Sequence, residues 1–350
     1  MKMRRLGRTD LSVSAICLGT MTYGQQNTEQ EGHAQMDRAF DRGVNFLDTA
    51  ELYPIPPKAE TQGRTETYIG NWMAARKNRS RVVVASKVVG RTSDEWFRGD
   101  RPNRLVRADI FDAVEKSLAR LQTDYIDLYQ IHFPERKIPW GSNPARRTTW
   151  PTPRDDDETP IAETLAVFDE LVKAGKIRHL GLSNESSWGV MRYLFESEKG
   201  NGPRVATLQN AYNLVNRTFE VNLAEVCERE DVGLLAYSPL AQGYLTGKYD
   251  NGARPAGSRT ALFNRGSRYE TPNAAETQLA YNELACGFGM EPALFANAFV
   301  TSRPFMASNI VGATTLEQLE MALDSADVTW TDEMQEAVDA IHQSTGNPCT

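Results

Sequence analysis

The sequence has few of the residues that bind metals or cross-link secreted domains. Its 350 residues include four cysteines and four histidines. The cysteines (Cys17, Cys227, Cys286 and Cys349) form no Cys-x-x-Cys pair, so we expect free thiols in a reducing, cytoplasmic compartment. The histidines stand singly along the chain. They supply no zinc ligand set, and the sequence predicts no metal site.

Long apolar runs and an excess of positive charge are also missing. No stretch approaches the roughly 20 apolar residues of a membrane-spanning helix, and the mean hydropathy is -0.49. The N-terminus begins with positive charge, but Asp10, Ser12 and Ser14 interrupt its apolar stretch, so we expect no export signal. A formal net charge of -7 gives no reason to expect nucleic acid or an anionic membrane as a partner.

What the chain does contain is a regular alternation of short apolar runs with amphipathic stretches. Eight runs are predicted as strands, at residues 15–19, 44–50, 82–88, 125–132, 177–183, 205–212, 232–238 and 309–313. Strands that alternate with helices favour parallel pairing through right-handed crossovers. Eight such units predict a closed (β/α)8 barrel, with residues 1–350 as one domain. An open doubly wound sheet is the alternative, but the first strand is followed by "GTMTYG" and not by Gly-x-Gly-x-x-Gly.

The helical stretches show a helical period. One apolar face of residues 109–122 is formed by Ile110, Val114, Leu118 and Leu121. The corresponding face of residues 161–176 is formed by Leu165, Phe168 and Leu171, and Gly175 is predicted to end that helix. Both faces are expected to pack against the strands.

Three connections are unusually long, at residues 54–64, 133–160 and 248–272. Each follows the C-terminal end of a predicted strand. In a barrel these ends lie on one face, where such folds build their active sites.

Chemically active side chains stand at several of those strand ends. Asp48 and Tyr53 follow one strand, Lys87 ends the next, and His132 ends the third. Each has an ordinary explanation by itself, such as a lysine whose ammonium group reaches solvent. In a closed parallel barrel, however, the four side chains would converge at one mouth.

Elementary electrostatics suggests what such a group could do. A free phenol has a pKa of roughly 10. A lysine ammonium about 4 Å away, at an effective dielectric of about 20, favours the phenolate by about 4 kcal/mol, or about three pKa units before desolvation opposes it. Asp48 would orient Lys87, and His132 could bind the substrate oxygen. Tyr53 would then be a general acid for a carbonyl oxygen, or the base for the reverse alcohol oxidation.

No side chain supplies a hydride, so this chemistry implies a nicotinamide cofactor. Ser183, Asn184 and Gln209 are suitable partners for its carboxamide, and Tyr237 could stack on its ring.

Eight segments together resemble the aldo-keto reductase superfamily across nearly the whole chain. They are "GTMTYG", "NFLDTAELY", "VVVASKV", "DYIDLYQIH", "KAGKIRHLGLSN", "QNAYNLVNR", "LLAYSPLAQGYLTGKY" and "IVGATTLEQLE". The Pro-containing insert after Tyr53 makes the chain most similar to the bacterial Tas-like branch, which is related to the potassium-channel β subunits. The resemblance implies a (β/α)8 barrel that reduces aldehydes or ketones with NADPH.

The resemblance also implies site residues. Asp48, Tyr53, Lys87 and His132 would form the catalytic tetrad, with Tyr53 as the proton donor. The residues expected at the cofactor are Thr20, Met21, Asp48, Ser183, Asn184, Gln209, Tyr237, Ser238, Leu240, Gly243, Lys248, Arg259, Gly312, Thr314, Thr315 and Gln318. The pyrophosphate and the adenosine phosphate would lie against the segment from Ser238 to Arg259. The adenosine would lie against Gly312, Thr314, Thr315 and Gln318.

The chain departs from the family pattern at the adenosine end. Gly312, Ala313 and Gln318 stand where many members carry residues that grip a 2′-phosphate, and Met321 and Ala322 replace a Glu-Asn pair. Lys248 and Arg259 could still hold the phosphate, so NADPH is preferred over NADH.

Two functions remain open. One is an active reductase of small carbonyl compounds, with Phe133, Trp140 and Trp150 favouring aromatic or aliphatic substrates over sugars. The other is an NADPH-binding regulatory or redox-sensing subunit with very slow turnover. The oligomeric state is not readable from the sequence.

Overall fold

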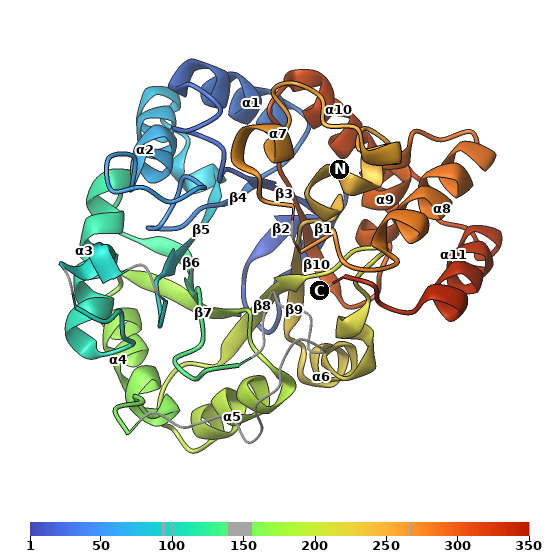
Figure 1. The fold of residues 1–350 in the computed structure, drawn as a ribbon. Helices are drawn as coiled ribbons and strands as arrows, with labels where there is room; N and C mark the ends of the chain where they lie inside the picture. The colour runs from blue at the N-terminus through green and yellow to red at the C-terminus, as the bar shows by residue number, and fades with distance from the viewer. Residues whose placement is uncertain (93–94, 100, 139–155, 267, 350) are drawn as a thin grey trace.

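Figure 1 shows the computed structural model, which describes residues 1–92, 95–99, 101–138, 156–266 and 268–349. Eight parallel strands in that part of the chain close into a barrel in the order β10-β3-β4-β5-β6-β7-β8-β9. In chain order they are β3 (Ile16–Gly19), β4 (Phe46–Asp48), β5 (Val83–Val88), β6 (Ile126–Ile131), β7 (Ile177–Ser183), β8 (Val205–Ala211), β9 (Gly233–Tyr237) and β10 (Met306–Val311). The predicted (β/α)8 barrel is confirmed.

Strand boundaries differ most at β10, which begins at Met306, three residues before the predicted start at 309. The observed strand includes the polar pair Ser308 and Asn309. Both side chains are in fact buried and hydrogen-bonded, Ser308 to the carbonyl oxygen of Ser14 at 2.8 Å and Asn309 to the hydroxyl of Thr301 at 3.0 Å. A buried polar residue is compatible with a strand interior when its hydrogen bonds are made.

Helices form a ring outside the strands (Figure 1). They are α1 (Glu29–Asp41), α2 (Arg64–Arg76), α3 (Arg107–Leu121), α4 (Ile161–Lys173), α5 (Ser187–Glu198), α6 (Leu223–Glu230), α8 (Ala274–Gly287), α9 (Pro292–Thr301), α10 (Leu316–Asp324) and α11 (Asp332–Thr345). The short helix α7 (Arg259–Phe263) belongs to the long connection after β9. The predicted apolar faces of α3 and α4 are buried. Gly175 follows the end of α4 with φ of 72°, as predicted for the residue that ends this helix.

A hairpin that the sequence did not indicate closes one end of the barrel. Strands β1 (Met3–Arg5) and β2 (Ser12–Ser14) pair antiparallel. Leu6, Leu11 and Val13 pack with residues near the starts of the barrel strands, including Phe46. Gly7 makes this approach possible: it has φ of +56°, and a Cβ there would lie 2.4 Å from the carbonyl oxygen of Ala206. The opposite end of the barrel is therefore the face available for chemistry.

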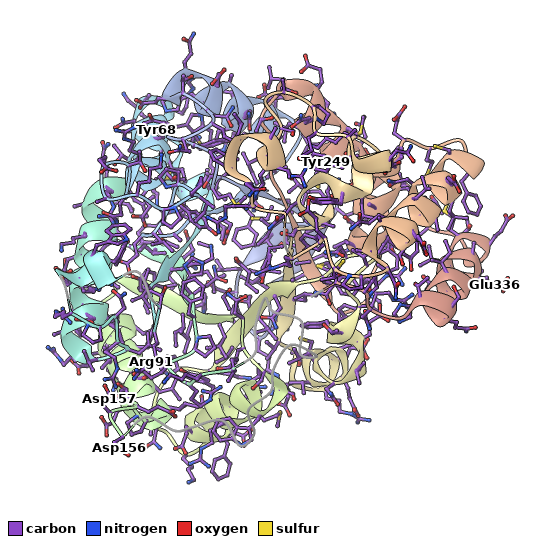
Figure 2. All side chains as sticks on the ribbon, viewed as in Figure 1. Tyr68, Arg91, Asp156, Asp157, Tyr249 and Glu336 are labelled. Carbon is purple, nitrogen blue, oxygen red and sulfur yellow. The ribbon has the colours of Figure 1, made fainter. Side chains whose placement is uncertain are left out.

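At that opposite face, the loop after β5 is tied to the long connection of residues 133–160. Arg91, after β5, lies 3.1 Å from Asp157, which precedes α4 (Figure 2). Arg91 also donates to the carbonyl oxygen of Glu135, after β6, at 3.0 Å. These contacts hold the described parts of two loops against each other.

Candidate active site

The four predicted catalytic residues meet at the C-terminal ends of three neighbouring strands. Asp48 ends β4, Lys87 lies in β5, and His132 directly follows β6, while Tyr53 comes from the turn after β4. All four are buried, with exposed fractions of 2%, 0%, 8% and 9% for Asp48, Lys87, His132 and Tyr53. Since β4, β5 and β6 are adjacent in the barrel, residues far apart in the sequence are brought into one group.

Lys87 lies at the centre of this group. Its Nζ donates to Oδ2 of Asp48 at 2.7 Å and to the carbonyl oxygen of Thr49 at 2.7 Å. The same atom lies 4.9 Å from the ring centre of Tyr53. Burial is the largest influence and works against a charged ammonium, but the charges and hydrogen bonds of Asp48 and Tyr53 together outweigh it, so the pKa of Lys87 is raised. Lys87 therefore stays charged beside the phenol.

The expected lowering of the Tyr53 pKa is not found in the free protein. Burial is the largest influence and raises the pKa of Tyr53 above its usual value. Lys87 opposes this rise, and Asp48 adds to it. The prediction rested on the attraction of the ammonium alone, whereas the phenol also loses water on burial and lies near the carboxylate of Asp48. At neutral pH Tyr53 is thus in its protonated form, which can donate a proton.

The imidazole of His132 packs against the rings of Tyr53 and Phe133. The two rings meet edge to face, with centroids 5.8 Å apart, and the imidazole stacks on Phe133 at 4.2 Å and 7°. Burial, and then the charge of Lys87, lower the pKa of His132 well below 6.5. Its Nδ1 is buried without a hydrogen-bond partner among the described residues. His132 is therefore a neutral imidazole at physiological pH.

Two glutamines complete the environment of Asp48. Its Oδ1 accepts from Nε2 of Gln209 at 2.8 Å and from Nε2 of Gln130 at 3.2 Å. Gln209 was predicted as a cofactor contact, and Gln130 was missed. Gln130 stands two residues before His132, so the alternation of side chains along β6 places both on the barrel interior. That alternation was the signal that could have found it.

The residues predicted at the nicotinamide form a connected group beside the tetrad. Asn184 has φ of 55°, and its Nδ2 donates to the carbonyl oxygen of His132 at 2.9 Å. The Tyr237 hydroxyl donates to Oδ1 of Asn184 at 2.7 Å. Ser183 donates to the carbonyl oxygen of Gln209 at 2.9 Å. The structure thus brings these four residues together at the ends of β7, β8 and β9.

The segment after β9 has an unusual backbone. Ser238, Gln242 and Gly243 have positive φ values of 57°, 59° and 102°. For residues other than glycine this conformation is costly and is often found at ligand sites. Leu240 lies in the same segment, directly before the 3-10 helix η5 (Ala241–Thr246). The Lys248 side chain lies close to Gly243. A Cβ added to Gly243 would be 2.7 Å from Cε of Lys248.

Three arginines gather beyond this segment, around α7. Burial and then the nearby charge of Arg265 lower the pKa of Arg259 to about 10, with Arg268 contributing further. Arg268 contacts the Tyr237 hydroxyl at 3.4 Å. Within the described residues, none of the three forms an ion pair with a carboxylate. A group of arginines without acidic partners is suited to an anion.

The remaining predicted residues lie at the ends of β3 and β10, which are neighbours. Thr20 donates to the carbonyl oxygen of Asp48 at 2.8 Å, and the carbonyl oxygen of Met21 accepts from the amide of Ile55 at 3.0 Å. Exposed Gly312 leads to α10, where the Thr315 hydroxyl caps the helix by accepting from the amide of Gln318 at 3.3 Å. The Gln318 side chain in turn accepts from the amide of Thr314 at 3.0 Å. Gln318 thus serves as a helix cap in the free protein.

The part of the chain that the structure describes contains neither a metal centre nor a single membrane-spanning helix. No group of three or more His, Cys, Asp or Glu side chains there could hold a metal ion. No single helix there is long and apolar enough to cross a membrane, although α8 and α9, bent by 95° at their junction, pass that test as a pair. Trp140 and Trp150, predicted at the mouth, lie outside the described residues.

The fold and the site together define the class: a parallel barrel with a buried Asp-Lys-Tyr-His group at the C-terminal ends of its strands. Residues 15–343 match the Aldo/keto reductase family, and the chain belongs to that family. It is 45% identical over 348 residues to "Protein tas" of Escherichia coli (strain K12), covering 98% of each chain. It is 33% identical to "Uncharacterized oxidoreductase YrpG" of Bacillus subtilis (strain 168), covering 94% of this chain and 92% of the relative. A "Probable voltage-gated potassium channel subunit beta" of Arabidopsis thaliana is 29% identical, covering 94% and 92%. The predicted likeness to the Tas-like branch is confirmed.

Proposed function

We propose that this protein reduces aldehydes and ketones to alcohols with NADPH. One observation carries the proposal: a buried lysine lies 2.7 Å from Asp48 and 4.9 Å from the ring centre of Tyr53, with a neutral His132 against that ring. The family membership of the chain supports oxidoreduction as the reaction class.

The side chains have separate roles in this proposal. Tyr53 donates the proton to the carbonyl oxygen as negative charge develops on it. Lys87 stabilises the phenolate that remains, and Asp48 keeps Lys87 charged and in place. His132, being neutral, can donate a hydrogen bond to the substrate oxygen without competing for the proton. In the reverse direction the Tyr53 phenolate takes the proton from the alcohol.

The residues present fit a nicotinamide cofactor, which when bound supplies the hydride. Ser183, Asn184 and Gln209 offer amide and hydroxyl groups for a carboxamide. The strained segment after β9 and the three arginines around α7, which have no carboxylate partner within the described residues, offer a site for phosphates. Since Gln318 carries no charge and already caps α10, we assign the preference for a 2′-phosphate to Arg259 and its neighbours.

We infer a small carbonyl compound of apolar character as the substrate. Phe133 is stacked on His132 and packs with Leu52 and Val89, so the imidazole has an apolar border on that side. This supports aromatic or aliphatic carbonyls over sugars.

The proposal is tested by the initial rate of NADPH oxidation with an activated aromatic aldehyde. Wild-type protein and Tyr53→Phe are compared, with dissociation constants for NADPH and NADH measured on both. We expect turnover in the variant to be lower by about 10²–10⁴-fold, with similar NADPH affinity in both proteins and weaker NADH binding. Equal turnover in the variant would exclude Tyr53 as the proton donor, and equal dissociation constants would exclude the NADPH preference.

A regulatory subunit is the second candidate, favoured by the relative whose name is a potassium channel subunit beta. It would bind NADPH tightly but turn over far below the roughly 1–10³ per second of typical enzymes. Tight binding with no measurable rate for a panel of good carbonyls would select this candidate.

A further inference from the structure

Glu51, two residues before Tyr53 in the same turn, forms a buried ion pair with Arg98. It lies between Asp48 and Tyr53 in the chain and is 1% exposed. Its Oε1 lies 2.6 Å from Nη2 of Arg98, in the 3-10 turn η2 (Glu95–Arg98) after β5. The Arg98 side chain is 4% exposed. Within the described residues, neither side chain forms a hydrogen bond or ion pair with the side chains of the tetrad, so the pair calls for another explanation.

The Glu51 carboxylate continues the hydrogen-bond ladder between β4 and β5 beyond the point where the main chain turns away. After the last paired residues, the amide of Thr49 donates to the carbonyl oxygen of Ala85 at 2.9 Å, and that of Glu51 to Lys87 at 3.3 Å. The next amide of this edge, at Val89, donates to Oε1 of Glu51 at 2.6 Å. The carbonyl oxygen of Glu51 instead accepts from the Gln62 side chain. A side chain thus replaces the main chain as acceptor, which fixes the tyrosine turn to the strand of Lys87.

The turn η2 reaches the histidine as well. Phe97 packs on the cluster of Leu52, Val89 and Phe133, and Phe133 stacks on His132. Arg98 and Phe97 are adjacent, so one short turn contacts the segment of Tyr53 through an ion pair and the neighbour of His132 through an apolar contact. Buried ion pairs add little net stability, because desolvation offsets their attraction. What this pair can supply is a defined geometry.

We propose that Glu51 and Arg98 are positioning residues that hold the Tyr53 turn in register with Lys87. This inference rests on the proposed role of Tyr53 as proton donor. It predicts that loss of the Glu51 carboxylate changes the rate of the chemical step and leaves substrate and cofactor binding intact. A misplacement of about 1 Å is enough to reduce turnover on the order of 10²-fold.

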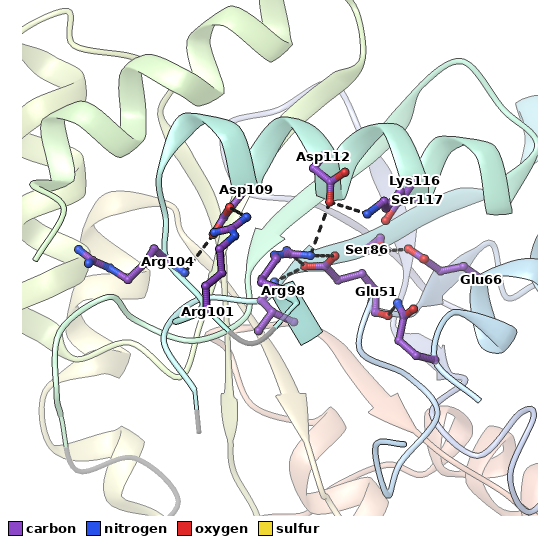
Figure 3. A network of polar contacts seen from close by, with 12 residues as sticks. Glu51, Glu66, Ser86, Arg98, Arg101, Arg104, Asp109, Asp112, Lys116 and Ser117 are labelled. Carbon is purple, nitrogen blue, oxygen red and sulfur yellow. Dashed lines mark hydrogen bonds and ion pairs between the residues drawn. The ribbon is translucent and has the colours of Figure 1, made fainter. Parts of the chain in front are cut away.

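The chain contains a matched control in the same wall of the barrel. Glu66 on α2 is also fully buried and lies 2.7 Å from Nε of Arg120. It accepts from the Ser86 hydroxyl at 2.5 Å and from Arg120, and it forms no hydrogen bond or ion pair with residues 49–53, although its charge adds to the rise in the Glu51 pKa, of which burial is the largest cause. Figure 3 shows the Glu51–Arg98 pair and the Glu66–Ser86 contact in one view. Both glutamates are buried charges with an arginine partner, and only Glu51 is in the tyrosine turn.

The first measurement is independent of catalysis. Hydrogen exchange is followed by mass spectrometry in peptides covering residues 48–54 and 86–90 of Glu51→Ala, Glu51→Gln and Glu66→Ala. We expect faster exchange in both peptides for Glu51→Ala and protection close to wild type for Glu66→Ala. Glu51→Gln keeps an acceptor for the Val89 amide and should lie between them. Equal exchange rates in Glu51→Ala and Glu66→Ala would overturn the inference.

The second measurement uses the same variants in the carbonyl reduction assay. We expect kcat to fall on the order of 10²-fold in Glu51→Ala, with KM and the NADPH dissociation constant close to wild type, and to recover partly in Glu51→Gln. In a Tyr53→Phe background, Glu51→Ala should lower kcat little further, because Glu51 acts only by positioning the Tyr53 hydroxyl, which is already absent. The positioning role would be contradicted if Glu51→Ala and Glu66→Ala lowered kcat equally and if each loss added in full to that of Tyr53→Phe. If the wild type itself shows no turnover, the proposed function fails, and the exchange result still decides whether Glu51 holds the turn.

Discussion

Replacing Lys87 with methionine tests the electrostatic centre of the site. The ammonium lies 4.9 Å from the ring centre of Tyr53. At an effective dielectric of about 20, this separation gives an attraction to the phenolate of about 3 kcal/mol. At about 1.4 kcal/mol for each pKa unit, the loss corresponds to roughly two units or slightly more. The phenolate of Lys87→Met should therefore be harder to form by about two orders of magnitude.

Alcohol oxidation reports this loss directly, because its rate at a fixed pH below the Tyr53 pKa follows the fraction of phenolate. We expect oxidation by Lys87→Met to be slower by about 10²-fold or more, with the cofactor dissociation constant close to wild type. An oxidation rate within a few fold of wild type would refute the argument that Lys87 stabilises the phenolate.

The same substitution should also unfold the protein more easily, and a second variant separates the two effects. Lys87→Met leaves the buried carboxylate of Asp48 without its ion-pair partner, which is expected to cost about 3–5 kcal/mol. The double variant Asp48→Asn/Lys87→Met removes both charges and should recover much of the free energy of unfolding, measured with denaturant. It should not recover the rate. Recovery of activity together with stability would mean that Lys87 matters only for folding.

Further predictions follow from the pKa directions, the closing hairpin and the arginines. Because the pKa of Tyr53 is raised and that of His132 is lowered well below 6.5, neither changes protonation between about pH 7 and 9. Carbonyl reduction should be flat over this range, and alcohol oxidation should rise about tenfold per pH unit; a break near 6.5 in reduction would contradict a neutral histidine. Gly7→Ala should destabilise the fold by about 1–3 kcal/mol more than Gly200→Ala, since both have positive φ but only Gly7 faces a carbonyl oxygen at 2.4 Å; equal unfolding midpoints would show that the hairpin is not tightly packed. Arg259→Ala should weaken NADPH binding about ten- to a hundredfold and NADH binding less, as measured by titration. An equal loss of affinity for both cofactors would show that Arg259 does not bind the 2′-phosphate.

Much of the barrel could be predicted because its strands are short apolar runs bounded by helices with a clear apolar face. The tetrad followed from the same pattern, since parallel strands bring their C-terminal ends together. Asp48, Lys87 and His132 each stand at the end of such a run, and Tyr53 follows in the next turn. The local pattern and the global topology agree at these positions, which is why the sequence predicted that the four side chains would meet, as they do in the structure.

The features that were missed depend on contacts between distant segments. The hairpin of β1 and β2 consists of three-residue strands, too short for a visible alternation, and it is stabilised by packing on the barrel interior. Gln130 reads as a polar interruption of β6 until Asp48 and Gln209 are placed beside it. The partner of Glu51 is 47 residues away, in a turn with no regular pattern.

The predicted downward shift of the Tyr53 pKa was wrong for a related reason. The sequence indicates that a lysine and an aspartate are near the phenol, but it does not indicate how much water surrounds them. Burial is the largest influence on Tyr53 in the structure. Desolvation is a property of the assembled site, and it can reverse a prediction made from charge alone.

The central claim, that Tyr53 is the proton donor in hydride transfer to a carbonyl, is tested most directly by a single turnover. NADPH-loaded wild-type and Tyr53→Phe proteins are mixed with excess aromatic aldehyde, and the loss of NADPH absorbance is followed from the first milliseconds. The account predicts a fast decay in the wild type, and in the variant a decay slowed by about 10²–10⁴-fold at unchanged cofactor occupancy. Equal decays in the two proteins would contradict it.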